Sequence, residues 1–96
     1  MIRHIAMLRW KDGTTDATVD AIEEALRPMP EIMPFIAGYE LGRDLGLNSS
    51  HHFVVIADFT SEDDYRAYAA QPEHKDVIDR LIAPVLDSIA RVQVAL

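Results

Sequence analysis

The chain has 96 residues, which fits a single domain spanning residues 1–96. Hydrophobic residues make up 49% of it, too many for a disordered tail, and its apolar runs are too short for a membrane span. The formal net charge of −7 leaves no basic surface for nucleic acid. The absence of cysteine excludes disulfides and thiolate chemistry. We therefore expect a cytoplasmic protein that binds neither nucleic acid nor a membrane.

The first predicted strand covers residues 2–10, and both of its faces are largely apolar. A strand with two apolar faces is expected to be covered on both sides. Residues 11–13 then predict a turn, because Gly13 follows a lysine and an aspartate. Thr14 or Thr15 can cap the helix that follows.

This first helix is predicted to run to about Leu26, with an apolar stripe at helical spacing. Pro28, Pro30 and Pro34 end it and predict an irregular connection. A second strand is expected over residues 35–43, followed by a loop that contains Gly42 and Gly46.

The third strand is expected over residues 52–59, again apolar on both faces. Ser61 can cap the next helix, whose first turn is acidic. Pro72 breaks this helix and suits the first turn of another, which Pro84 ends or kinks. The last strand is predicted over residues 87–96.

The predicted order is strand, helix, strand, strand, helix, strand, which is the α+β, ferredoxin-like βαββαβ arrangement with a four-stranded antiparallel sheet. The helices can cover only one face of this sheet. We expect the other face to carry Ile5, Met7, Val54, Ile56 and Ile89. Two such faces packed together in a homodimer would bury these residues.

The leading candidates for chemistry are Tyr68 and His74, which flank the helix break at Pro72. Histidine titrates near neutrality, so a sheltered His beside a Tyr hydroxyl predicts a general acid/base pair. The competing interpretation is a helix-capping histidine next to a packed tyrosine, and spacing alone favours it.

His4 lies on the same predicted strand face as Ala6 and Leu8, beneath the helices. It is either a pocket residue or a buried histidine bonded to the backbone. Ala6 and Ala90 are small, which leaves room for a ligand or for a close helix. His51 and His52 are adjacent on an extended segment and point apart, so no metal site is expected.

The chain resembles the stress-responsive A/B barrel (Dabb) family of dimeric α+β barrels. The resemblance covers nearly the whole chain and is carried by residues 4–12, 42–46 and 57–59, and by Tyr68 with residues 71–74. It implies a ferredoxin-like subunit and a homodimer whose two sheets form a barrel.

The family includes a plant polyketide cyclase, olivetolic acid cyclase, whose Tyr and His acid/base pair matches Tyr68 and His74. The resemblance implies that His74 removes a proton next to a carbonyl and that Tyr68 assists. A first-strand pocket histidine of the cyclase matches His4, whereas a third-strand one falls at Phe53. The expected pocket lining is His4, Ala6, Leu8, Leu26, Phe53, Val55 and Ala90.

Three functions remain open at this point. The first is an enzyme without a cofactor, such as a cyclase, lyase or isomerase, acting on a small carbonyl or polyketide-like compound. The second is a non-catalytic dimer that binds a small apolar ligand or serves a stress-associated role. The third and weaker one is a monooxygenase-like activity.

Overall fold

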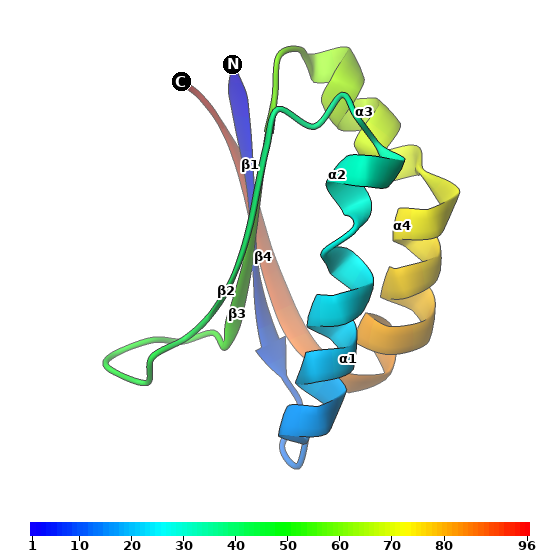
Figure 1. The fold of residues 1–96 in the computed structure, drawn as a ribbon. Coiled ribbons are helices and arrows are strands. Elements are labelled where there is room, and N and C mark those ends of the chain that lie inside the picture. Colours follow the sequence, from blue (N-terminus) through cyan, green and yellow to red (C-terminus); the bar gives the residue numbers. More distant parts are fainter.

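The computed structural model describes residues 1–96 and shows one antiparallel sheet with helices on one face only (Figure 1). The strands lie in the order β2-β3-β1-β4. Their bounds are β1 (Ile2–Trp10), β2 (Gly38–Arg43), β3 (Phe53–Phe59) and β4 (Leu86–Ala95). The predicted ferredoxin-like fold is confirmed, and the two chain ends lie side by side on neighbouring strands.

The helices begin where the sequence predicts. Helix α1 (Asp16–Leu26) is capped by Thr15, whose hydroxyl accepts from the Thr18 N–H at 3.2 Å. Helix α3 (Glu62–Ala70) is capped by the Ser61 hydroxyl in the same way. The proline-rich connection differs from the prediction, because it contains a short helix α2 (Met29–Ile32) with a proline in its first turn.

Helix α4 (Pro72–Val77) does not continue as a regular helix. It passes into a π-helical turn η1 (Ile78–Ile82) and a 3₁₀ turn η2 (Ala83–Val85) that contains Pro84. A π turn is wider than an α turn and often occurs next to functional sites. No helix of the chain is long and apolar enough to span a bilayer.

The core lies between the helices and one face of the sheet. Its buried apolar residues are Ala6, Leu8, Trp10, Val19, Ile22, Leu26, Met29, Met33, Ile36, Phe53, Val55, Ala57, Phe59, Tyr68, Val77 and Ile82. His4 is the one polar residue in this layer and is only 5% exposed.

The prediction for the two faces of β4 was wrong. Met7 pairs with Ala90 and Leu8 pairs with Ile89, so Ala90 faces away from the helices and Ile89 faces toward them. A register shift at Arg9 and Trp10 fixes this arrangement. The face opposite the helices therefore carries Ile5, Met7, Val54, Ile56, Ala90, Val92 and Val94. We call these residues the outer face.

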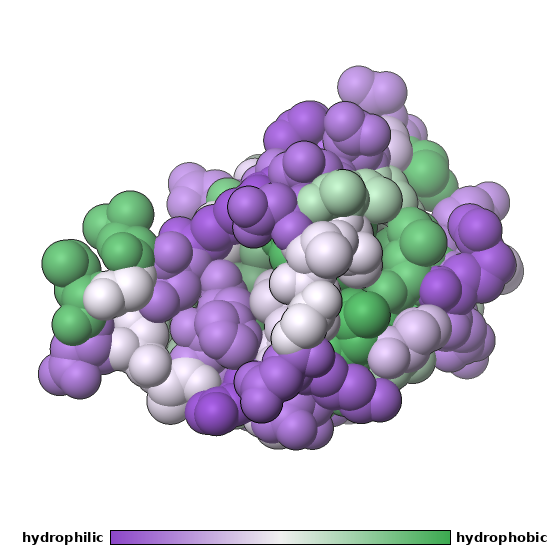
Figure 2. Space-filling model, turned by 90° about the horizontal axis from the view of Figure 1, so that it is seen from below, coloured by the Kyte–Doolittle hydropathy of each residue, from purple (hydrophilic) through white to green (hydrophobic).

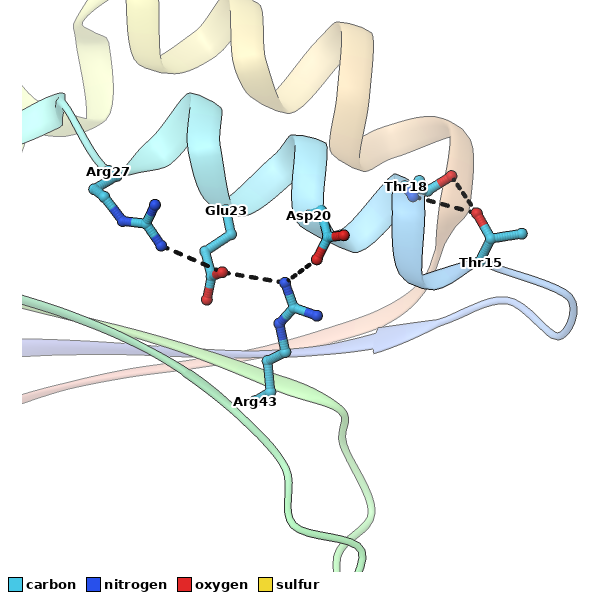
Figure 3. A network of polar contacts seen from close by, with 6 residues as sticks. All are labelled: Thr15, Thr18, Asp20, Glu23, Arg27 and Arg43. Atoms are coloured by element: carbon cyan, nitrogen blue, oxygen red, sulfur yellow. Dashed lines mark hydrogen bonds and ion pairs between the residues drawn. The ribbon is translucent and has the colours of Figure 1, made fainter.

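An ion-pair network holds α1 against the far edge of the sheet (Figure 3). Arg43, the last residue of β2, reaches Asp20 at 2.6 Å and Glu23 at 3.1 Å, both on α1. Arg27 adds a contact to Glu23 at 3.3 Å. This network links α1 to β2, and none of its residues lines the cavity at Tyr68 and His74.

The loop between β2 and β3 projects from the side of the sheet that the helices leave open (Figure 1). Leu45 and Leu47 in this loop are 85% and 83% exposed. Figure 2 shows the projecting segment with hydrophobic surface at its end. An apolar loop tip and an apolar sheet face thus lie on the same side of the molecule.

Candidate active site

A small cavity lies between the inner face of the sheet and the helical layer. Its volume is about 70 Å³, and it is mostly apolar. The lining residues come from β1, β3, β4, α1, α3, α4 and the turns that follow α4. They are His4, Ala6, Leu8, Leu26, Val55, Tyr68, His74, Ile78, Ile82, Leu86, Ile89 and Arg91.

Tyr68 and His74 meet at this cavity. Their ring centroids are 4.2 Å apart with the planes inclined by 39°, so the rings stack and do not hydrogen-bond. Gln71 leaves the helical conformation between them, and Pro72 starts α4 in a new direction. The helix break therefore turns the two side chains toward the same space.

His4 approaches the pair from β1. Its ring centroid is 5.9 Å from that of Tyr68 and 5.2 Å from that of Tyr65. The Gln93 side-chain amide donates to His4 Nδ1 at 2.9 Å, so the proton of the neutral imidazole sits on Nε2. The amide of Gln93 thereby fixes the tautomer of His4.

Four titratable side chains line the cavity, and burial keeps three of them, His4, Tyr68 and His74, uncharged at neutral pH; the fourth is Arg91. Burial lowers the pKa of His74 to about 4, helped by His4, and it lowers the pKa of His4, helped by Arg91. It also raises the pKa of Tyr68 to about 12, with Tyr65 adding to the effect. His74 is thus a neutral base and Tyr68 a protonated donor.

One polar atom of this cluster has no hydrogen-bond partner. His74 Nδ1 is buried and unpaired, which is uncommon for a buried ring nitrogen. The Tyr39 hydroxyl on β2 is also buried without a well-formed hydrogen bond, but it lies close enough to the Tyr68 hydroxyl for that group to help raise the pKa of Tyr39. Unsatisfied polar groups beside a cavity are a frequent property of sites that bind a ligand.

Five residues of the predicted pocket lining, His4, Ala6, Leu8, Leu26 and Val55, line this cavity. Two others, Phe53 and Ala90, do not. Phe53 points to the helical side but packs on Trp10, with ring centroids 5.9 Å apart, and so misses the cavity.

The other predicted lining residue that lies outside the cavity is Ala90, which is on the outer face opposite Met7. The same register shift brings in two residues that the sequence interpretation placed on the other face, Ile89 and Arg91. A correct pairing of the last strand with the first would have revealed both.

The two adjacent histidines before β3 serve local structure. His52 Nδ1 accepts from the Trp10 backbone N–H at 2.9 Å, beside the register shift of β1. His51 Nδ1 lies 2.8 Å from the Ser50 hydroxyl. No three His, Asp or Glu side chains of the chain lie close enough to share a metal ion.

Comparisons with solved structures place the chain among dimeric ferredoxin-like proteins. A dimeric ferredoxin-like protein of unknown function from Thermobifida fusca is 41% identical, with 99% of this chain and 90% of that chain covered and a TM-score of 0.89. A dimeric protein of unknown function from Bacteroides fragilis is 21% identical over 99% and 95% of the two chains, with a TM-score of 0.88. No curated protein matches significantly by sequence.

A hydroxynitrile lyase from Passiflora edulis shares the fold, with a TM-score of 0.85 and 19% identity over 99% of this chain and 92% of that chain. The family model described as "Stress responsive A/B Barrel Domain" matches residues 2–95, almost the whole chain. The chain therefore belongs to the stress-responsive A/B barrel domain (Dabb) family.

Proposed function

We propose that the protein is a cofactor-independent acid/base enzyme that acts on a small carbonyl compound. The observation that carries this proposal is the stacking of His74 on Tyr68 at the wall of a mostly apolar cavity. His74 has a buried ring nitrogen without a partner, and Tyr68 has a hydroxyl that stays protonated. These are the two groups that proton transfer next to a carbonyl requires.

In the proposed step, His74 accepts a proton from the carbon next to the substrate carbonyl. The electron pair of the broken C–H bond forms a C=C bond, and the π pair of the carbonyl moves onto its oxygen, which becomes an enolate oxygen. Tyr68 donates a hydrogen bond to that oxygen. Transfer of the proton from His74 to a different atom of the enolate, or to the opposite face of the same carbon, completes an isomerisation. General acid/base assistance of this kind contributes roughly 10²–10⁴-fold in rate.

The size of the cavity supports a small substrate. A volume of about 70 Å³ is far below that of sites for drug-sized ligands, which are roughly 300–1,000 Å³. This favours a compound with few non-hydrogen atoms over a folded polyketide chain.

Proton exchange tests the proposal directly. Small ketones, aldehydes and oxo acids are incubated with the protein in D₂O, and loss of the signal of the proton next to the carbonyl is followed by NMR. We expect His74→Ala to lower the exchange rate at least about 100-fold and Tyr68→Phe to lower it less. Lys75→Ala, next along α4 and exposed, is the matched control. Full exchange by the His74 variant would refute the role of His74.

A non-catalytic ligand-binding protein is the second candidate, because most residues that line the cavity are apolar. The same NMR samples separate the two functions. A compound that shifts the resonances of cavity residues, yet whose protons never exchange faster than in buffer, would favour binding without catalysis.

We also propose that the protein is a homodimer through the outer face. Met7, Val92 and Val94 on this face are 39%, 47% and 40% exposed, an apolar patch that water would otherwise cover. The exposed leucines of the β2–β3 loop project on the same side. The Thermobifida fusca and Bacteroides fragilis proteins of this fold are described as dimeric, which supports the proposal.

Light scattering at micromolar concentration measures the assembly. We expect a dimer that Val92→Glu converts to a monomer, because the new carboxylate would be buried opposite Ile5 without a partner. Ala21→Glu adds the same charge on an exposed position of α1 and should leave the dimer intact. A wild-type monomer would contradict the proposal.

A further inference from the structure

Arg91 differs from every other arginine of the chain. The six others form ion pairs with carboxylates: Arg3 with Asp58, Arg9 with Asp87, Arg27 and Arg43 with Glu23, Arg66 with Glu62, and Arg80 with Asp76. Arg91 has no carboxylate within ion-pair distance, although the chain holds 16 acidic residues. A lone cation in so acidic a protein needs an explanation.

The position of Arg91 supplies one. It pairs with Ala6 across β4 and β1, on the face that carries the cavity, and it lines that cavity together with His74. No Asp or Glu is among the lining residues. Ala6, the neighbour of Arg91 on β1, lines the same cavity. The cavity therefore carries one positive charge and no counterion.

We propose that Arg91 binds the carboxylate of the substrate, so that the site takes small oxo or hydroxy acids. This inference rests on the proposed function, because it names the substrate class of the same cavity. A guanidinium presents paired N–H donors that fit a carboxylate in a two-point contact. With the carboxylate held there, the carbon next to the carbonyl lies within a cavity whose other polar groups are His4, Tyr68 and His74.

The cavity volume limits the length of such an acid. A water molecule needs roughly 10–15 Å³ of the same kind of space, so about 70 Å³ corresponds to roughly five to seven waters. That is close to the number of non-hydrogen atoms in an acid of about three or four carbons. Pyruvate and acetoacetate are therefore suitable probes.

Binding of pyruvate and of pyruvamide, its neutral counterpart of the same shape, tests the role of Arg91. NMR titration should show pyruvate binding with the resonances of Ala6 and His74 shifting, and pyruvamide binding about 10- to 100-fold more weakly. Arg91→Gln should remove this preference, and Arg91→Lys should retain part of it. Arg66→Gln on α3 is the control, since Arg66 lies outside the cavity.

Three results would overturn the inference. The first is equal affinity of the wild type for pyruvate and pyruvamide. The second is unchanged pyruvate affinity in Arg91→Gln, and the third is absence of binding by both pyruvate and acetoacetate. Thermal unfolding should show the variant as stable as the wild type, because Arg91 is exposed and has no ion pair to lose.

The failure of this inference is distinguishable from that of the proposed function. If His74 catalyses proton exchange in neutral ketones while Arg91 has no effect, the proposed acid/base activity is supported and the preference for acids is refuted. If pyruvate binds through Arg91 but its protons never exchange faster than in buffer, carboxylate binding by Arg91 is supported and the catalytic role of His74 is refuted.

Discussion

The two faces of the sheet place most of their titratable side chains in different environments. On the inner face, burial holds His4, Tyr68 and His74 uncharged around a cavity. On the outer face of the same strands, Arg3 and Asp58 form a charged two-point pair at 2.9 and 3.0 Å. His4 and Arg3 are neighbours in sequence, so the alternation of a strand is enough to place them in these different environments.

This difference separates the groups that can do chemistry from those that hold the fold. A solvated ion pair satisfies its own partners and has little left to offer a substrate. A neutral histidine with an unpaired nitrogen beside a cavity can accept a proton. The helices that cover the inner face therefore create the site by removing water from it.

The largest expected effect contrasts the two faces of β3. Phe59 is fully buried on the inner face against Tyr65 and Tyr68, and Phe59→Ala should lower the free energy of unfolding by about 3–5 kcal/mol. Ile56→Ala on the outer face of a lone subunit should cost less, because its side chain is only half-buried. Urea unfolding measures both.

Protein concentration sharpens this test. If the outer face is covered in a dimer, the cost of Ile56→Ala should grow as the concentration of protein rises, whereas the cost of Phe59→Ala should stay large at every concentration. A cost below about 1 kcal/mol for Phe59→Ala would contradict its place in the core.

The next effect is the dependence of stability on pH. The pKa of His74 falls from an ordinary value of about 6.5 to about 4 in the folded chain, so the unfolded state binds more protons between these values. Stability is then fully present above pH 6.5 and declines as the pH falls toward 4. Because His74 is partly exposed and water weakens the effect, the free energy of unfolding should fall by about 1–3 kcal/mol over this range.

Urea unfolding of His74→Gln across the same pH range is the check. Glutamine does not titrate, so the slope between pH 4 and 6.5 should flatten. Asp58 acts at lower pH, because Arg3 holds its pKa below the ordinary carboxyl value and its contribution is lost only in stronger acid. An unchanged slope in the His74 variant would show that another group causes the acid sensitivity.

The sequence was sufficient for the order of the elements, because caps and prolines mark their ends physically. Thr15 and Ser61 start helices by accepting from backbone N–H groups, and Pro72 forces the break that brings Tyr68 to His74. On β1 and β3, the residues expected to face away from the helices, Ile5, Met7, Val54 and Ile56, pair with one another on the outer face.

The last strand shows the limit of such predictions. Both faces of β4 contain apolar residues, so periodicity alone could not decide which of them meets the helices. The extra residue near the Arg9–Trp10 register shift decides it. Ile89 and Arg91 line the cavity and Ala90 does not, because of the pairing between β1 and β4, two strands that are distant in sequence.

A moderate effect is expected at Gly38 on the outer face. A Cβ at this position would lie 3.0 Å from Asp58 Oδ2, tighter than ordinary van der Waals contact, so the carboxylate would have to shift by a few tenths of an ångström. Gly38→Ala should therefore displace the carboxylate from its two-point contact with Arg3 and cost about 1 kcal/mol in urea unfolding. The pKa of Asp58, measured by NMR, should rise toward the ordinary carboxyl value in this variant.

The smallest effect is the coupling between Arg3 and Asp58 itself. The Arg3 side chain is 41% exposed, so water screens the pair, and a double-mutant cycle with Arg3→Gln and Asp58→Asn should give a small stabilising coupling. If a partner subunit covers the outer face, it removes water from around the ion pair and strengthens the interaction between the two charges. The coupling should then increase with protein concentration. A constant coupling across the dimerisation range would place this ion pair outside the interface. In that case the apolar centre of the outer face, around Met7 and Val92, would carry the association alone.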